Sequence, residues 1–130
     1  MKIILDLCGG TGSWSKPYKE AGYDVRIITM PECDARLFPS KRSTLPRIPS
    51  EFVSIEDYEN VHGILAAPVC TVFSGSGACR KRSDSEMIEG LSLVDACLRI
   101  VHTLNPVWWC LENPVGKLRK WIGEPKKIGL

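Results

Sequence analysis

The sequence lacks any Cys-x-x-Cys pair, and it has only two histidines beside its six cysteines. This spacing argues against a zinc site and against the disulfide framework of a small secreted domain. We therefore expect no bound metal and reduced thiols, as in a cytoplasm. Each cysteine can then be judged by its own surroundings.

Long hydrophobic runs are also absent. No stretch approaches membrane-spanning length, and the apolar segment from Met1 to Leu7 is far too short for an export signal. We expect no membrane association. Glycine-rich phosphate-binding signatures are missing as well, because no Gly-Lys-Ser/Thr follows the first glycine turn and the Gly-x-Gly-x-x-Gly spacing does not occur.

A large excess of one charge is likewise lacking. The net charge of +2 says little about partners. Basic residues gather in two places, at Arg80, Lys81 and Arg82 and in the segment 117–127. Both clusters would suit a phosphate backbone, but ordinary solvated charge explains either of them equally well.

The length and composition fit one soluble globular domain spanning residues 1–130. A chain of 130 residues with 44% hydrophobic and 25% charged residues can bury a real core without a metal or disulfide. No internal repeat or low-complexity tract divides the chain.

The first thirty residues follow a strand, glycine turn, helix, strand pattern. Lys2–Leu7 is a short apolar run that ends in glycines, and 25–29 is a second β-branched run. Between them, Ser15 is an expected helix N-cap, Pro17 suits the first turn, and Gly22 suits the stop. This order predicts a βαβ unit with parallel strands and a right-handed crossover.

The remainder predicts further alternation after a proline-rich excursion over residues 30–60. One weak strand is expected at 52–55, and firmer strands are expected at 62–66 and 107–111. Ser83 and Glu86 have capping-box spacing ahead of apolar residues that recur every three or four positions. A short basic helix is expected at 117–122. The fold class is therefore α/β, with an open, doubly wound, mostly parallel sheet that binds its ligand at the carboxyl ends of the strands.

The segment from Asp6 to Trp14 is the first candidate site. Glycines after a first strand let the backbone approach a ligand and aim helix N–H groups at it. A purely structural turn would use similar residues. Glu32 follows the second strand at about the separation, some 20 residues, at which an acid binds ribose in nucleotide-binding βαβ units. An exposed loop acid is the competing interpretation.

Cys70 is the pivotal residue of the second site. It follows a strand and precedes a Gly/Ser-rich loop, which would expose a nucleophilic thiolate. An inert buried cysteine is the usual alternative, and Cys8, Cys97 and Cys110 fit it, while Cys79 fits either. His62 or His102 could approach Cys70 in space, although no motif supports a papain-like hydrolase.

Glu112 ends the apolar run that contains two tryptophans. A carboxylate in such surroundings is expected to have a raised pKa and to hold or share a proton. Pairing with Arg119 or Lys120 is the competing interpretation.

Together these motifs resemble cytosine-5 DNA methyltransferases. Asp6-Leu7-Cys8-Gly9-Gly10-Thr11-Gly12 is similar to the family's first motif, Pro31-Glu32-Cys33-Asp34 to its second, Pro68-Val69-Cys70 with Phe73-Ser74 to the nucleophile motif, and Glu112-Asn113-Pro114 to the Glu-Asn-Val/Pro motif. All four occur in the family's order, and the resemblance runs from about Lys2 to Ile122. The compact spacing is most similar to phage or prophage members, so the cytoplasm of a bacterium or of a phage-infected host is the expected location.

The resemblance implies a Rossmann-like class I methyltransferase core that uses S-adenosylmethionine and acts on DNA. Cys70 would add to carbon 6 of a flipped cytosine while Glu112 protonates ring nitrogen 3, so that carbon 5 takes the methyl group. The implied catalytic residues are Cys70, Glu112 and Asn113. The implied cofactor-binding residues are Asp6, Cys8, Gly9, Gly10, Thr11, Gly12, Ser13, Trp14, Glu32, Cys33 and Pro68, and those implied for DNA are Ser74, Arg80, Lys81 and Arg82.

Three substitutions and the ending depart from the family pattern. Val69 replaces the usual proline, which should loosen the nucleophile loop at a cost of about 0.4–1 kcal/mol. Thr71 replaces a glutamine, and Cys33 replaces an aromatic residue that would stack on adenine. The arginine-bearing later motif, the target-recognition segment and the last strands have no counterpart. We therefore expect an incomplete core, which fits a truncated chain, a degenerate remnant or half of a split enzyme. In the last case a second polypeptide or self-association would complete the sheet.

Two other functions remain open from the sequence. One is a non-catalytic module that keeps only the cofactor pocket or the basic surface. The other is a different cysteine enzyme that acts on a free nucleotide without DNA.

Overall fold

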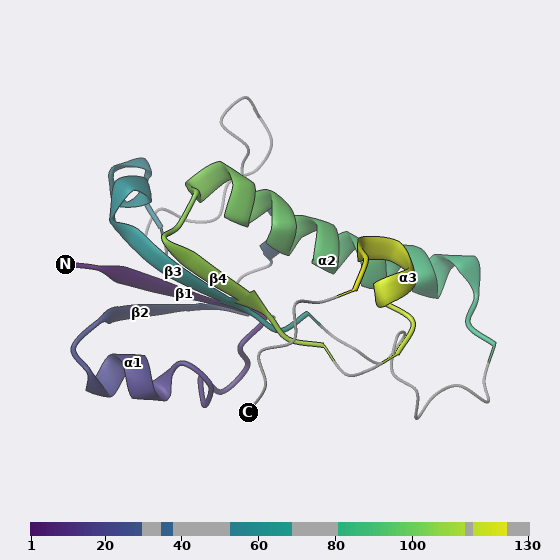
Figure 1. Ribbon diagram of the computed structural model, residues 1–130, viewed down its shortest axis with the longest axis horizontal. Coiled ribbons are helices and arrows are strands. Elements are labelled where there is room, and N and C mark those ends of the chain that lie inside the picture. Colours follow the sequence, from purple (N-terminus) through teal and green to yellow (C-terminus); the bar gives the residue numbers. More distant parts are fainter. Residues whose placement is uncertain (30–34, 38–52, 69–80, 114–115, 125–130) are drawn as a thin grey trace.

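The computed structural model describes residues 1–29, 35–37, 53–68, 81–113 and 116–124 (Figure 1). Four strands form one sheet, and all neighbouring pairs are parallel. The strands are β1 (Ile3–Leu7), β2 (Asp24–Ile28), β3 (Val61–Ala66) and β4 (Trp108–Leu111), in the spatial order β2-β1-β3-β4. The expected α/β class and parallel sheet are thus confirmed.

Helices cover both faces of this sheet. Helix α1 (Lys16–Glu20) connects β1 to β2 on one face, and α2 (Asp84–Leu104) connects β3 to β4 on the other (Figure 1). The described chain also has α3 (Arg119–Ile122) and two short 3-10 helices, η1 (Ala35–Leu37) and η2 (Ile55–Asn60). Because the chain winds outward in both directions from β1 and β3, the strand order reverses between these two strands.

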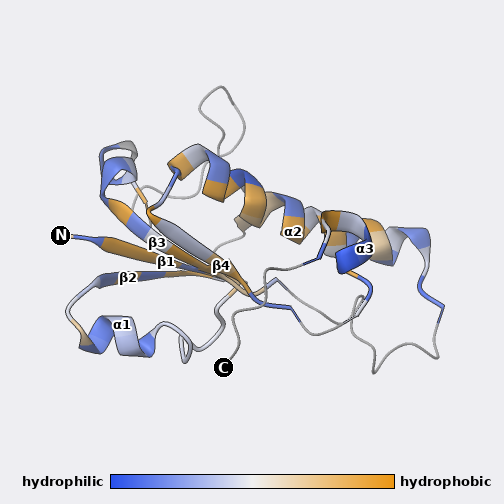
Figure 2. Cartoon of the chain, viewed as in Figure 1, coloured by the Kyte–Doolittle hydropathy of each residue, from blue (hydrophilic) through white to orange (hydrophobic). Residues whose placement is uncertain are grey.

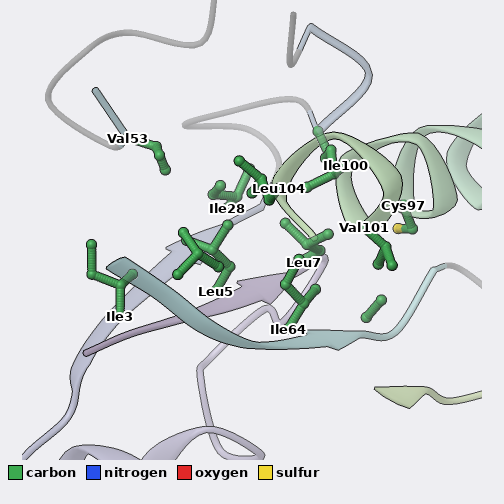
Figure 3. Close-up of a cluster of buried hydrophobic side chains, with 13 residues drawn as sticks. Ile3, Leu5, Leu7, Ile28, Val53, Ile64, Cys97, Ile100, Val101 and Leu104 are labelled. Atoms are coloured by element: carbon green, nitrogen blue, oxygen red, sulfur yellow. The ribbon is translucent and has the colours of Figure 1, made fainter. Parts of the chain in front are cut away.

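The main core lies between the sheet and α2. Alternate residues of β1, namely Ile3, Leu5 and Leu7, point to this side and are almost completely buried (Figure 3). They pack against Cys97, Ile100, Val101 and Leu104 of α2. Figure 2 shows the apolar central strands and the mixed polar and apolar surface of α2. The period of two along β1 therefore leaves its even-numbered residues for the α1 side.

Helix α2 begins where the sequence predicts. The Ser83 hydroxyl accepts from the Glu86 backbone N–H at 3.3 Å, and the Glu86 carboxylate accepts from the Ser83 backbone N–H at 2.9 Å. This capping box satisfies N–H groups that have no partner within the helix. The amino-terminal half of α2 forms a second small core in which Val94 and Leu118 are buried beside Leu111.

One local expectation is wrong. Of the segment expected as a strand at 52–55, the described residues 53–55 instead lead into η2, whose first turn is held by a capping box between Ser54 and Asp57. Ser15 is at the N-cap of α1, as expected, but its hydroxyl donates to the Gly12 carbonyl oxygen at 3.2 Å and makes no capping bond. Pro17 and Gly22 take their expected places, with Gly22 at φ 90° just after the helix.

Within the described residues, no helix is both long and apolar enough to span a bilayer. The same part of the chain contains no group of three His, Cys, Asp or Glu side chains arranged to hold a metal ion.

Candidate functional site

The carboxyl ends of β1, β3 and β4 lie side by side. Leu7 pairs with Ala66, and Ala66 pairs with Leu111. Two further hydrogen bonds extend this alignment past the strands, from the Ala67 N–H to the Leu7 carbonyl at 3.0 Å and from the Glu112 N–H to the Ala66 carbonyl at 2.8 Å. The segments that leave the three strands therefore start from one edge of the sheet, at the reversal of strand order where open α/β sheets bind ligands.

The turn after β1 is tight and left-handed at three positions. Cys8, Gly10 and Gly12 have φ values of 60°, 56° and 74°. The Gly12 N–H donates to the Gly9 carbonyl at 3.0 Å, and the Lys16 N–H donates to the Gly12 carbonyl at 3.0 Å. Glycine suits the left-handed region at no steric cost, and at Gly12 a Cβ would also overlap the Ile27 side chain. The turn is thus fixed closely against β2.

Asp6 lies on the α1 side of β1, directly beneath Gly9. It is fully buried, and neither carboxylate oxygen has a hydrogen-bond partner among the described residues. A Cβ at Gly9 would overlap this carboxylate, so glycine is required there for the close approach. Burial raises the pKa of Asp6 above its ordinary value of 3.8, and the neighbouring Ser15 opposes part of that increase. An orphaned buried carboxylate of this kind is costly in stability unless a ligand supplies donors.

The exposed rim of the turn is polar. Gly10, Thr11 and Ser13 are exposed, and the Thr11 and Ser13 hydroxyls share a hydrogen bond of 2.8 Å. Trp14 is half-buried beside them in sequence. The turn therefore combines a buried carboxylate with surface hydroxyls and backbone groups.

A side chain links the exits of β3 and β4. The Asn113 Nδ2 group donates to the Pro68 carbonyl oxygen at 3.3 Å, and the Asn113 Oδ1 atom is buried without a partner in the described chain. Pro68 itself is buried. The sequence places both residues at strand ends, but it does not predict that they bond to each other. The signal that could have found the contact is their position: each residue lies two positions past the end of its strand, and the two strands are parallel neighbours.

Glu112 differs from the expectation drawn from its sequence. Glu112 is exposed, so the apolar surroundings that were expected around it are not found in this structure. The reason is the exposure of β4 itself, where Trp109 and Cys110 are also exposed. The competing ion pair is not seen either within the described residues, where Arg119 pairs instead with Glu124 at 3.7 Å.

The described cysteines divide into three environments. Cys97 is buried, as expected, whereas Cys110 is exposed, contrary to the expectation of an inert buried thiol. Cys8 is half-buried and packs against the main core. His62 stacks on Tyr23 at the amino end of β3, and His102 lies in the last turn of α2. Both histidines thus lie away from the carboxyl ends of the strands, which weakens the cysteine-hydrolase alternative.

Several of the expected site residues fall outside the described residues, namely Glu32, Cys33, Cys70, Ser74, Cys79 and Arg80. Of the remaining basic pair, Lys81 is exposed and Arg82 forms an ion pair with Glu86 at 3.7 Å. These two residues immediately precede α2, which starts beyond the carboxyl end of the sheet (Figure 1).

Comparisons with family models, curated proteins and solved structures found no match to this chain.

Proposed function

We propose that this chain is the core of a cytosine-5 DNA methyltransferase that takes its methyl group from S-adenosylmethionine. The observation that carries the proposal is the glycine turn over Asp6, whose buried carboxylate has no hydrogen-bond partner in the described part of the chain. This turn lies at the reversal of strand order. The exits of β3 and β4, which lead to the nucleophile and Glu-Asn motifs, start beside that turn. The ordered motifs of the sequence supply the identity of the reaction.

The residues of the turn fit the methionine end of this cofactor. Its ammonium group carries positive charge and hydrogen-bond donors. The two Asp6 oxygens, which lack a partner among the described residues, would accept those hydrogen bonds. Thr11 and Ser13 add exposed hydroxyls, and Glu32 would accept the ribose hydroxyls. When bound, the cofactor supplies an electrophilic methyl group.

The reaction chemistry then rests on Cys70 and Glu112. The Cys70 thiolate would add to carbon 6 of the flipped cytosine, and Glu112 would protonate ring nitrogen 3, so that carbon 5 becomes nucleophilic. Asn113 would act as a positioning residue, because its amide holds the backbone at Pro68, two residues before the nucleophile. DNA contacts are assigned to Ser74, Arg80, Lys81 and Arg82 through their phosphate-binding chemistry.

The exposed edge of the described sheet supports the proposal that a protein partner takes part in this reaction. Among the described strands, β4 is the outer one beside β3, and Trp109 on it is 49% exposed. An outer strand with an exposed tryptophan is a template for a further strand. We propose that a second polypeptide, or a second copy of this chain, pairs there and closes the site around Glu112.

Cofactor binding tests the proposed role of the glycine turn. Gly9→Ala should weaken S-adenosylmethionine binding by about tenfold or more, since the added methyl group displaces the Asp6 carboxylate. Titration calorimetry measures the dissociation constant. Gly22→Ala is the matched control, because Gly22 is also left-handed but has open space around its Cβ position and lies beyond α1.

The control should lose some stability and keep its affinity for the cofactor. Equal affinities of the Gly9 variant and the wild-type chain, with both proteins folded, would remove Asp6 and Gly9 from the proposed site. If neither the wild-type chain nor either variant binds S-adenosylmethionine, the proposed cofactor is wrong.

A further inference from the structure

Cys8, the residue directly after β1, packs against the main core on the α2 side of the sheet. An extended chain would have placed it on the opposite side. Odd-numbered residues of β1 face α2, so an extended Cys8 would face α1 together with Asp6. Its left-handed backbone, with φ 60°, turns the side chain toward the main core instead. A non-glycine residue in this region carries a conformational cost, so the placement calls for a compensating interaction.

Cys97 is the thiol that Cys8 meets there. It lies on α2, is fully buried, and belongs to the core cluster against which Cys8 packs (Figure 3). The hydrogen bond to Cys8 raises the pKa of Cys97, and burial and the charge of Cys8 raise it further.

We propose that Cys8 and Cys97 are an oxidative modification site, at which an intramolecular disulfide joins the glycine turn of β1 to α2. The proposal stands on the left-handed turn that packs half-buried Cys8 against the core cluster to which buried Cys97 belongs. It requires no ligand, so it stands or falls independently of the proposed methyl transfer.

Glutathione disulfide is the oxidant in the proposed reaction. Because Cys8 is more exposed than Cys97, Cys8 reacts with it first. The Cys8 thiolate attacks one sulfur of the oxidant, which forms a mixed disulfide and releases a glutathione thiolate. Cys97 then gives up its proton, and its sulfur attacks the Cys8 sulfur and expels the second glutathione thiolate. Both protein thiols are oxidised, and one glutathione disulfide is reduced to two glutathione molecules.

Peptide mapping of the full-length chain tests this assignment. After incubation with glutathione disulfide and alkylation of the remaining thiols, the expected product contains a peptide pair linked through Cys8 and Cys97. Exposed Cys110 serves as an internal reference, because it can take a glutathione adduct but has no role in the linked pair. A Cys110 adduct without any Cys8–Cys97 link would overturn the proposal.

Two cysteine variants test whether Cys97 is the thiol that resolves the mixed disulfide at Cys8. Cys97→Ser should accumulate the mixed glutathione adduct at Cys8 at least several-fold over the wild-type chain, whereas Cys110→Ser should form the Cys8–Cys97 link unchanged. Equal accumulation of the adduct at Cys8 in wild type and Cys97→Ser would show that Cys97 does not resolve it.

The stability of the wild-type chain provides a measurement that no variant can confound. The linked form should unfold at a higher urea concentration than the reduced form, because the bond constrains the unfolded chain. A lower midpoint for the linked form would show that the sulfurs meet only in a distorted structure, which would contradict the native contact.

Discussion

Asp6 and Asp57 are two carboxylates whose pKa values move in opposite directions. Asp6 has no hydrogen-bond partner among the described residues, and burial raises its pKa. Asp57 accepts from Arg26 Nη1 at 2.6 Å and from the Ser54 backbone N–H at 2.9 Å. These bonds, that of Arg26 foremost, lower the pKa of Asp57 to about 2. The contrast separates a buried carboxylate that lowers stability from one that stabilises the fold.

Asp6→Asn should stabilise the free protein at pH 7 by about 1 kcal/mol, because it removes a buried negative charge for which the described residues provide no partner. With a raised pKa, folded Asp6 binds its proton more tightly than the unfolded chain does. Wild-type stability should therefore fall as pH rises from 3.8 through the folded pKa, and this part of the slope should vanish in the variant. Urea unfolding at a series of pH values measures it; identical slopes for both proteins would contradict the assignment.

Asp57→Asn should lower the free energy of unfolding by about 1–2 kcal/mol at pH 7, because the charge-assisted bonds to Arg26 are weakened. A lowered pKa contributes stability above the unfolded value of 3.8 that disappears as pH falls through about 2. The difference between variant and wild type should therefore close over this range in acid unfolding curves.

Lys16→Gln is the control for that measurement. It breaks the exposed 3.8 Å pair with Glu20, and such pairs contribute about 0–1 kcal/mol. A loss in the control as large as that in Asp57→Asn would show that burial within the Arg26 network has no special effect.

At the scale of elements, β3 and β4 are joined by a close contact on the α1 side of the sheet. The Trp108 indole lies over Gly63, where any Cβ would overlap the ring. The same ring stacks on Tyr18 of α1, with centroids 5.4 Å apart. Gly63 thus lets one tryptophan hold α1 against β3.

Gly63→Ala should lower the free energy of unfolding by about 1–3 kcal/mol, because the added methyl group overpacks this contact. In a Trp108→Leu background the same change should cost less, since the ring that it meets is gone. Urea denaturation of the four proteins gives the coupling. Equal costs in the two backgrounds would show that the indole is not the obstacle.

Most elements could be predicted because their signals are local. The apolar run of β1 and the Ser83–Glu86 capping box each specify their element within a few residues. The η2 helix was missed, although Ser54 and Asp57 have the same capping spacing, because a short apolar run at 52–55 fits a strand equally well. The contact between Cys8 and Cys97 could not be predicted, since it depends on one left-handed residue and on how α2 crosses the sheet.

At the scale of the whole molecule, the sequence predicts where the candidate residues lie but not how they are enclosed. Strand ends in parallel order bring the turn at Asp6 beside the exits at Pro68 and Glu112, as the alternating pattern indicates. The exposure of Glu112 could not be predicted, because the two tryptophans before it are typical of a buried strand. In the described sheet, however, β4 is an outer strand. An apolar sequence does not reveal which of its strands has no neighbour.

The most direct measurement is covalent trapping on DNA that carries 5-fluorocytosine, in the presence of S-adenosylmethionine. Fluorine at carbon 5 cannot leave as the proton does, so a chain that has transferred a methyl group stays attached through its nucleophile. We expect an adduct that maps to Cys70, requires the cofactor and is absent from Cys70→Ala. A folded chain that binds cofactor and DNA yet forms no adduct, or forms one equally well without Cys70, would contradict the proposed methyl transfer.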